Sequence, residues 1–142
     1  MQKTLLLIKP DAVKNKHIGE IISEIEKEFE ILDIKFTRLT KTQAKRFYAI
    51  HKNKDFFNGL IDFITSGPVV ALLLQGHNVQ NKVRQFIGDT DPKKAKAGTI
   101  RNKFGTSIQK NAVHASNPLE NPEKEIKFFF PYVRIKKQRR HK

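Results

Sequence analysis

The amino-acid sequence predicts an α+β sandwich in which helices cover a four-stranded antiparallel sheet. Two uniformly apolar runs, residues 5–8 and 69–74, are typical of central strands buried on both faces. The segments between and after these runs carry the apolar spacing of amphipathic helices. The order of elements is strand, helix, strand, helical insert, strand, helix, loop, short strand and helix. This order favours a sandwich of ferredoxin-like type.

The first half of the chain contains two predicted strands around a predicted helix. Residues 5–8 form the first strand, and the apolar residues of segment 18–29 repeat at helical spacing. Leu32, Ile34 and Phe36 then alternate with polar residues, which is the period of a strand with one face in water. We expect this second strand to pair beside the first.

A helical insert separates the second strand from the third. Thr42 is the candidate N-cap of its first helix, and residues 57–64 have the spacing of a second helix. The Ser66-Gly67-Pro68 segment ends the insert and precedes the central strand at residues 69–74.

Two further helices have clear boundary residues. Asn78 is a candidate N-cap, and Gly88 ends that helix. Asn121 and Pro122 begin the last helix, which Pro131 stops. Residues 89–110 show no sustained period and are too long for an ordinary connection, which indicates a functional loop.

Size and composition exclude several classes of protein. The 142 residues match one domain with a hydrophobic core, and we assign residues 1–131 to it. The absence of cysteine excludes disulfides, thiolate metal sites and cysteine catalysis. The apolar run at residues 5–8 is too short for a signal peptide or a membrane span. We therefore expect a cytoplasmic protein without a membrane partner.

The net charge of +14 is concentrated in part at the C-terminus. Residues 132–142 are rich in lysine and arginine, and they predict a basic tail outside the packed domain. The tail is either a solubilising end or a contact for nucleic acid, a membrane surface or an acidic partner.

His114 is the histidine with the strongest chemical context. An imidazole acts as a nucleophile when one ring nitrogen is free and an acceptor holds the other. Glu125, in the first turn of the last predicted helix, is a plausible acceptor, and Ser116 is a candidate for a second hydrogen bond. Taken alone, His114 is also compatible with a surface histidine on a strand edge.

Candidate phosphate-binding residues come from separate segments of the chain. Lys9, Arg84, Thr90 and Arg101 offer cations or hydroxyl donors beside predicted turns. The sequence has neither a GxxxxGK[ST] motif nor a GxGxxG motif, so a glycine-rich phosphate loop is not supported. Phosphate binding would therefore depend on side chains.

Six short segments, in this order and spacing, resemble the nucleoside diphosphate kinase family. They are residues 7–13 (LIKPDAV), 56–60 (FFNGL), 66–70 (SGPVV), 88–92 (GDTDP), 98–101 (GTIR) and 111–116 (NAVHAS). The resemblance extends from residue 2 to about residue 130, and the ordered set around N-x-x-H-x-S is highly specific.

The resemblance implies a role for each matching residue. His114 would accept the phosphoryl group, with Glu125 and Ser116 orienting it and with Lys9 and Tyr48 assisting catalysis. The nucleotide site would be lined by Lys9, Tyr48, Phe56, Arg84, Thr90, Arg101 and Asn111. Arg84, Thr90 and Arg101 would hold phosphates, Lys9 and Asn111 would reach the sugar hydroxyls, and Phe56 would stack on the base.

The reaction implied by the resemblance is transfer of the γ-phosphoryl group from a triphosphate such as ATP to a nucleoside diphosphate. It would proceed by a ping-pong mechanism through phosphohistidine. Mg²⁺ would be held by the substrate phosphates and not by protein ligands. Stacking on the base implies acceptance of ATP, GTP, UTP, CTP and their deoxy forms.

Some positions depart from the family pattern. Asn117 stands where aspartate is usual, and Ala115 where glycine is common. Ala97 and Asn102-Lys103 lie in the loop that family members use for subunit contacts. The resemblance implies a homo-oligomer, with a hexamer favoured over a tetramer or a dimer.

Two other classes of function compete with the kinase. A basic nucleic-acid-binding module with a ferredoxin-like sheet would account for the charge, but the strands lack the glycine-aromatic RNA-binding signature. A catalytically silent scaffold of the same fold is the other alternative. The presence of His114, Lys9 and Arg84 argues against it.

Overall fold

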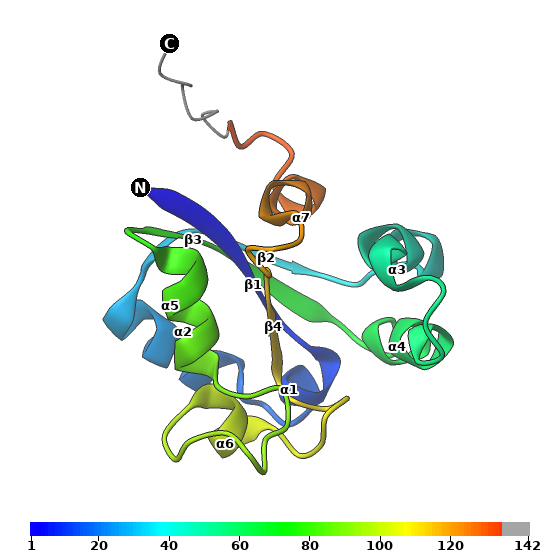
Figure 1. Ribbon diagram of the computed structural model, residues 1–142, viewed down its shortest axis with the longest axis horizontal. Coiled ribbons are helices and arrows are strands. Elements are labelled where there is room, and N and C mark those ends of the chain that lie inside the picture. The colour runs from blue at the N-terminus through cyan, green and yellow to red at the C-terminus, as the bar shows by residue number, and fades with distance from the viewer. Residues whose placement is uncertain (135–142) are drawn as a thin grey trace.

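The computed structural model describes residues 1–134 and contains one antiparallel sheet with strand order β2-β3-β1-β4 (Figure 1). The strands are β1 (Gln2–Ile8), β2 (Glu30–Thr37), β3 (Val69–Gly76) and β4 (Val113–Ala115). The helices are α1 (Pro10–Lys14), α2 (Ile18–Glu28), α3 (Lys41–Phe47), α4 (Phe57–Ile64), α5 (Val79–Ile87), α6 (Ile100–Phe104) and α7 (Pro122–Phe129), with a 3-10 turn at Ala49–His51. This architecture confirms the predicted α+β sandwich.

The period of strand β1 divides the core into two layers. Leu5 and Leu7 pack with residues of α3, α4 and α7 on one face of the sheet. Leu6 and Ile8 pack with α2 and α5 on the other face (Figure 1). Because successive side chains of a strand point to opposite faces, a continuous apolar run supplies both layers at once.

Strand β2 does not pair beside β1, contrary to the sequence-based expectation. It pairs with β3, and β1 lies between β3 and β4. The two strands that are apolar on both faces occupy the centre, where helices cover both sides. The half-polar β2 lies at the edge, which tolerates polar residues and contact with water.

The apolar side chains of β2 are also less buried than the alternation predicted. Leu32, Ile34 and Phe36 are 41%, 48% and 64% exposed. The register shifts between Ile31 and Asp33, so Leu32 lies at a β-bulge. These three residues form an exposed apolar strip along the edge of the sheet, which we call the β2 strip.

The helix caps agree only in part with the sequence analysis. Asn121 caps α7 through a hydrogen bond from Lys124 N at 3.1 Å, and Gly88 ends α5 with a φ of 92°. Asn78 precedes α5, but its φ is 51° and its side chain makes no capping hydrogen bond. The predicted cap Thr42 is wrong, because α3 already begins at Lys41.

Thr40 is the residue that caps α3. Its hydroxyl accepts a hydrogen bond from Gln43 N at 3.1 Å, and Thr40 N donates to Gln43 Oε1 at 3.0 Å. These reciprocal bonds form a capping box. Thr42 is exposed inside the helix.

The loop after α5 contains a short helix that the sequence did not reveal. Thr99 caps α6 by accepting a hydrogen bond from Asn102 N at 3.3 Å. Gly88 allows the loop to approach closely, since a Cβ at this position would lie 2.6 Å from Thr99 Oγ1. Segment 89–110 is therefore a folded loop packed beside the end of α5.

Packing at the C-terminus continues past residue 131. Val133 is buried beside Phe129 and Phe130, and the Tyr132 hydroxyl donates a hydrogen bond to Asp33 on β2. Most of the predicted basic tail, residues 135–142, lies outside the described residues. Within residues 1–134, no helix has the length and apolarity needed to cross a membrane.

We predict that Thr40→Ala lowers the free energy of unfolding by about 1 kcal/mol, because it removes the cap of α3. The matched control is Thr42→Ala, which should change stability by less than about 0.5 kcal/mol. Urea unfolding followed by circular dichroism measures both variants. Equal losses in the two variants would contradict the assignment of the cap to Thr40.

Candidate active site

Strand β4 sets the direction of His114. Leu7 on β1 is paired with His114, and the neighbours Val113 and Ala115 are buried in the α2/α5 layer. His114 therefore points to the opposite face, where α7 lies. The alternation of a three-residue strand brings the imidazole to the first turn of α7.

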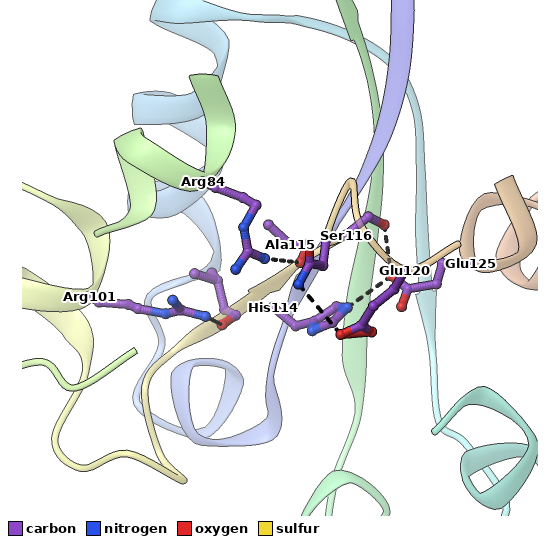
Figure 2. A network of polar contacts seen from close by, with 9 residues as sticks. Arg84, Arg101, His114, Ala115, Ser116, Glu120 and Glu125 are labelled. Carbon is purple, nitrogen blue, oxygen red and sulfur yellow. Dashed lines mark hydrogen bonds and ion pairs between the residues drawn. The ribbon is translucent and has the colours of Figure 1, made fainter. Parts of the chain in front are cut away.

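His114, Ser116 and Glu125 form a hydrogen-bonded group (Figure 2). His114 Nε2 lies 2.9 Å from Glu125 Oε1, and Ser116 Oγ donates to the same oxygen at 2.7 Å. Burial alone would raise the pKa of Glu125, but the hydrogen bonds from His114 and Ser116 outweigh it and lower the pKa. An ionised carboxylate only accepts hydrogen bonds, so this contact favours the neutral imidazole tautomer with its proton on Nε2.

Two arginines hold the backbone around β4. Arg84 Nη1 donates to Ala115 O at 3.1 Å (Figure 2). Arg101 donates to Val113 O at 3.0 Å and to Gly88 O at 3.1 Å. Burial lowers the pKa of Arg101 to about 10, with a further contribution from Arg84, so the guanidinium stays charged at neutral pH. Both cations are positioned before any ligand binds.

Lys9 follows β1 and contacts the residues that precede β4. Its Nζ donates to Gln109 O at 2.7 Å and to Asn111 Oδ1 at 2.9 Å. Asn111 in turn donates to Thr90 O at 3.0 Å. Burial lowers the pKa of Lys9 to about 8, and of the nearby charges Asp11 opposes this shift while Arg101 adds to it.

A strained turn precedes β4. Ala112 has a φ of 75°, and Val113 N donates to Asn111 O at 2.9 Å, which together define a γ-turn with positive φ. A non-glycine residue in such a conformation costs on the order of 1–3 kcal/mol. The surrounding contacts must therefore hold the turn in place.

A cavity of about 510 Å³ collects nearly all of the predicted site residues. It is lined by Lys9, Tyr48, Phe56, Arg84, Thr90, Arg101, Asn111, His114 and Glu125. Ser116 is fully buried and does not line the cavity. Its hydroxyl reaches the cavity lining through its hydrogen bond to Glu125. This position fits the predicted role of Ser116 in orienting the His114–Glu125 pair.

The insert supplies the wall opposite the cations. The rings of Tyr48 and His114 are 6.0 Å apart in an edge-to-face arrangement. Burial raises the pKa of Tyr48, with a smaller effect from Glu125, so the phenol keeps its proton. Phe56 is 54% exposed at the mouth of the cavity.

Ile108 and His51 also line the cavity, and the sequence analysis did not select them. Ile108 is 61% exposed and lies in the aperiodic segment 89–110, where no pattern identifies it. His51 follows α3 in a 3-10 turn, and its Nδ1 is buried with no hydrogen-bond partner within residues 1–134. Helical spacing in the sequence did not indicate that His51 lines a cavity.

The family-pattern departures leave the group around His114 intact. Asn117 Oδ1 accepts a hydrogen bond from Leu119 N at 2.9 Å, and Asn117 Nδ2 donates to Glu120 Oε1 at 3.5 Å. Ala115 does not have a positive φ, so a side chain fits there. Asn102 donates to Ala95 O, and Lys103 pairs with Glu24, so both take part in holding the loop.

The sequence model of the family described as nucleoside diphosphate kinase matches residues 2–135. This chain belongs to that family. A nucleoside diphosphate kinase 1 from Protochlamydia amoebophila is 52% identical over 130 residues, which cover 91% of this chain and 92% of the relative. A nucleoside diphosphate kinase from a Nitratiruptor species is 51% identical over 131 residues, covering 92% and 96%.

Solved structures of nucleoside diphosphate kinases share the fold. The Aquifex aeolicus enzyme has a TM-score of 0.86 and 40% identity, covering 89% of this chain and 93% of that one. The Halobacterium salinarum enzyme in complex with CDP has a TM-score of 0.87 and 39% identity, covering 91% and 87%. The predictions of family, of a nucleotide-binding phosphotransferase and of γ-phosphoryl transfer between nucleotides are confirmed.

We predict that Glu125→Gln destabilises the protein near pH 7 and has a smaller effect as the pH falls. The lowered pKa means that the ionised carboxylate stabilises the fold above the ordinary value of 4.5, and this contribution is lost as the pH drops through the lower folded value. Urea unfolding of both proteins across the acid range measures the difference. Glu123→Gln, an exposed change in the same helical turn, is the control.

An unchanged difference between the Glu125→Gln variant and the parent protein over the whole range would refute the assigned hydrogen bonds of the ionised Glu125 carboxylate with His114 and Ser116. In the Glu123→Gln control, little destabilisation is expected near pH 7, because Glu123 is exposed and does not line the cavity.

Proposed function

We propose that the transferred phosphoryl group is carried by His114 Nδ1 in a ping-pong exchange. The observation that supports this role is the contact of Nε2 with the ionised Glu125, which leaves Nδ1 as the nitrogen with a free lone pair. Ser116 donates to the same carboxylate oxygen and fixes its orientation. A histidine held in this way is a nucleophile without a separate base.

The exchange proceeds in two half-reactions. In the first, Nδ1 attacks the γ-phosphorus of a triphosphate, the bond to the bridging β-γ oxygen breaks, and the diphosphate leaves with that electron pair. In the second, a terminal oxygen of another nucleoside diphosphate attacks the phosphorus, and the bond to Nδ1 breaks. One site serves both nucleotides in turn, so the kinetics are ping-pong.

The cations stabilise the charge that develops on the phosphoryl oxygens. Arg84, Arg101 and Thr90 contact phosphates, and Lys9 with Asn111 reaches the sugar hydroxyls near the terminal phosphate. Phosphoryl transfer asks a protein mainly for alignment and electrostatic stabilisation. The backbone contacts of the arginines limit the reorganisation needed during reaction. Tyr48 stays protonated beside His114 and donates a hydrogen bond to the ligand.

Mg²⁺ is the proposed cofactor, and the residues of the cavity fit a metal carried by the substrate. Among residues 1–134 no group of three or more histidines or carboxylates is arranged to hold a metal ion. Glu120 and Glu125 are the carboxylates that line the cavity, together with the cations Lys9, Arg84 and Arg101. Mg²⁺ usually keeps several waters and binds substrate phosphates, where it neutralises charge.

Phe56 is proposed to stack on the base, with Ile108 as a second apolar surface at the mouth of the cavity. Stacking reads the π-face that every base has, so selectivity among bases is low. The proposed substrates are ATP, GTP, UTP, CTP, their deoxy forms and the matching diphosphates.

The enzyme is proposed to be a cytoplasmic homo-oligomer, with a hexamer favoured over a tetramer. The β2 strip supports self-association, because Leu32, Ile34 and Phe36 form an exposed apolar surface on the edge strand of the sheet. Nucleic-acid contact through the basic tail concerns residues 135–142 for the most part, which lie outside the described residues.

We predict that incubation with Mg-ATP adds one acid-labile phosphoryl group to the protein, and that GDP, UDP or CDP each remove it as the triphosphate. His114→Ala should abolish labelling and exchange while ADP binding persists, because the cations and Phe56 remain. Intact mass spectrometry at alkaline pH measures the label. His77→Ala, which removes an exposed histidine away from the cavity, is the matched control and should label normally.

Labelling of the His114→Ala variant at the rate of the parent protein would rule out His114 as the carrier. Exchange without any labelled intermediate would instead rule out the ping-pong route.

We predict that Phe56→Ala weakens nucleotide binding by about 1–3 kcal/mol for all bases, which is the usual contribution of stacking. Titration calorimetry with ADP, GDP, UDP and CDP measures the loss. Phe56→Tyr keeps an aromatic ring and serves as the control. A loss confined to one base would contradict the stacking role.

A further inference from the structure

Asp11 is a buried carboxylate that the proposed transfer reaction does not use. It lies in the first turn of α1 and is 9% exposed. Its Oδ2 accepts a hydrogen bond from Ala112 N at 3.0 Å, whereas Oδ1 is buried without a hydrogen-bond partner among the described residues. A buried carboxylate with only one oxygen satisfied is unfavourable for folding, so its presence requires a physical reason.

The contacts of Asp11 lead to the strained turn before β4. Ala112 has a φ of 75°, which glycine adopts without strain and alanine does not. The start of α1 holds this residue from both sides: Asp11 accepts its N–H, and Lys9 N donates to its carbonyl at 2.9 Å. Ala112 is completely buried, so these contacts are protected from water.

The turn connects two functional side chains. Asn111 precedes Ala112 and pairs with Lys9 Nζ, and His114 follows two residues later on β4. A relaxed turn at Ala112 would change the direction in which the chain enters β4. It would therefore move Asn111 and His114 together.

We infer that Asp11 is a positioning residue for phosphoryl transfer: its carboxylate holds the strained 111–113 turn, and the turn sets His114 and Asn111 against the substrate. This inference rests on the proposed phosphohistidine route. Asp11 does not line the cavity, and it acts through the backbone of Ala112.

The charge of Asp11 has a second effect, on Lys9. Burial lowers the pKa of Lys9, Arg101 lowers it further, and Asp11 opposes both. Gln109 O and Asn111 Oδ1 accept hydrogen bonds from the ammonium but carry no net charge. Loss of the Asp11 charge therefore lowers the pKa of Lys9 below its value of about 8, and Lys9 becomes neutral at a lower pH.

Two substitutions separate these effects. Asp11→Asn keeps an oxygen that accepts the Ala112 N–H but removes the charge, whereas Asp11→Ala removes both. Ala112→Gly, added to Asp11→Ala, relieves the strain that the carboxylate holds. The control is Asp62→Asn, at an exposed aspartate that pairs with Lys41 on the surface. The measurements are the single-turnover rate of His114 phosphorylation by saturating Mg-ATP and the dissociation constant of ADP.

At the acid end of the pH range, where Lys9 is charged, Asp11→Ala is expected to slow phosphorylation by about 10-fold to 100-fold, the effect of a small misplacement of a reacting group. The ADP dissociation constant should change by less than about threefold. The Asp11→Ala/Ala112→Gly variant should phosphorylate at least about threefold faster than Asp11→Ala. Asp11→Asn should keep most of the phosphorylation rate of the parent protein. The fall of this rate at high pH should begin at a lower pH than in the parent protein.

A parent-like rate in Asp11→Ala, or a double variant no faster than Asp11→Ala, would overturn the positioning role. If Asp11→Ala does not fold, the Asp11→Ala/Ala112→Gly variant decides, because relief of the strain at Ala112 should restore folding; a double variant that also fails to fold overturns the inference. Failure of the proposed function is distinguishable, because the parent protein itself would then show no phosphorylation of His114.

Discussion

The register between β1 and β4 is the constraint on which the site depends. Leu7 is paired with His114, and Leu6 and Ile8 are paired with Ala115 and Val113. A slip of one residue would turn His114 into the α2/α5 layer and Val113 toward the cavity. The strand has only three residues, so its register is fixed by contacts at both ends. These contacts are the arginine bonds to its carbonyls and the turn that precedes it.

The proposed phosphate site is built without a glycine-rich loop. Arg84 comes from α5, Arg101 from α6 and Lys9 from the end of β1, so three separate elements converge on one cavity. Each cation is held by backbone or amide oxygens of the protein. The side chains are therefore ordered by the fold, and little conformational freedom is lost when a ligand binds.

The sequence predicts those parts of the molecule that depend on neighbouring residues in the chain, such as apolar runs and short motifs. The apolar runs of β1 and β3 can only be central, and His114 and Glu125 carry distinctive chemistry within a motif. The pairing of β2 was not predictable, because its alternation fits an edge beside either central strand. The cap at Thr40 and the cavity wall at Ile108 depend on backbone geometry and loop packing, which leave no period. The inferred role of Asp11 was not predictable for another reason. It depends on the positive φ of Ala112, which lies more than a hundred positions further along the chain.

The gathering of cations in one cavity links the stability of the enzyme to its substrate. Burial is the main cause of the lowered pKa values of Arg101 and Lys9, but Arg84 also lowers the pKa of Arg101, and Arg101 that of Lys9, as expected of like charges that line one cavity. A polyphosphate bound there as proposed would offset the repulsion between these charges and so would stabilise the folded state. A nucleotide present at about 100 times its dissociation constant adds roughly 2.7 kcal/mol to the free energy of unfolding. Through the proposed site, the nucleotide pool of a cell would therefore contribute to the stability of the folded protein.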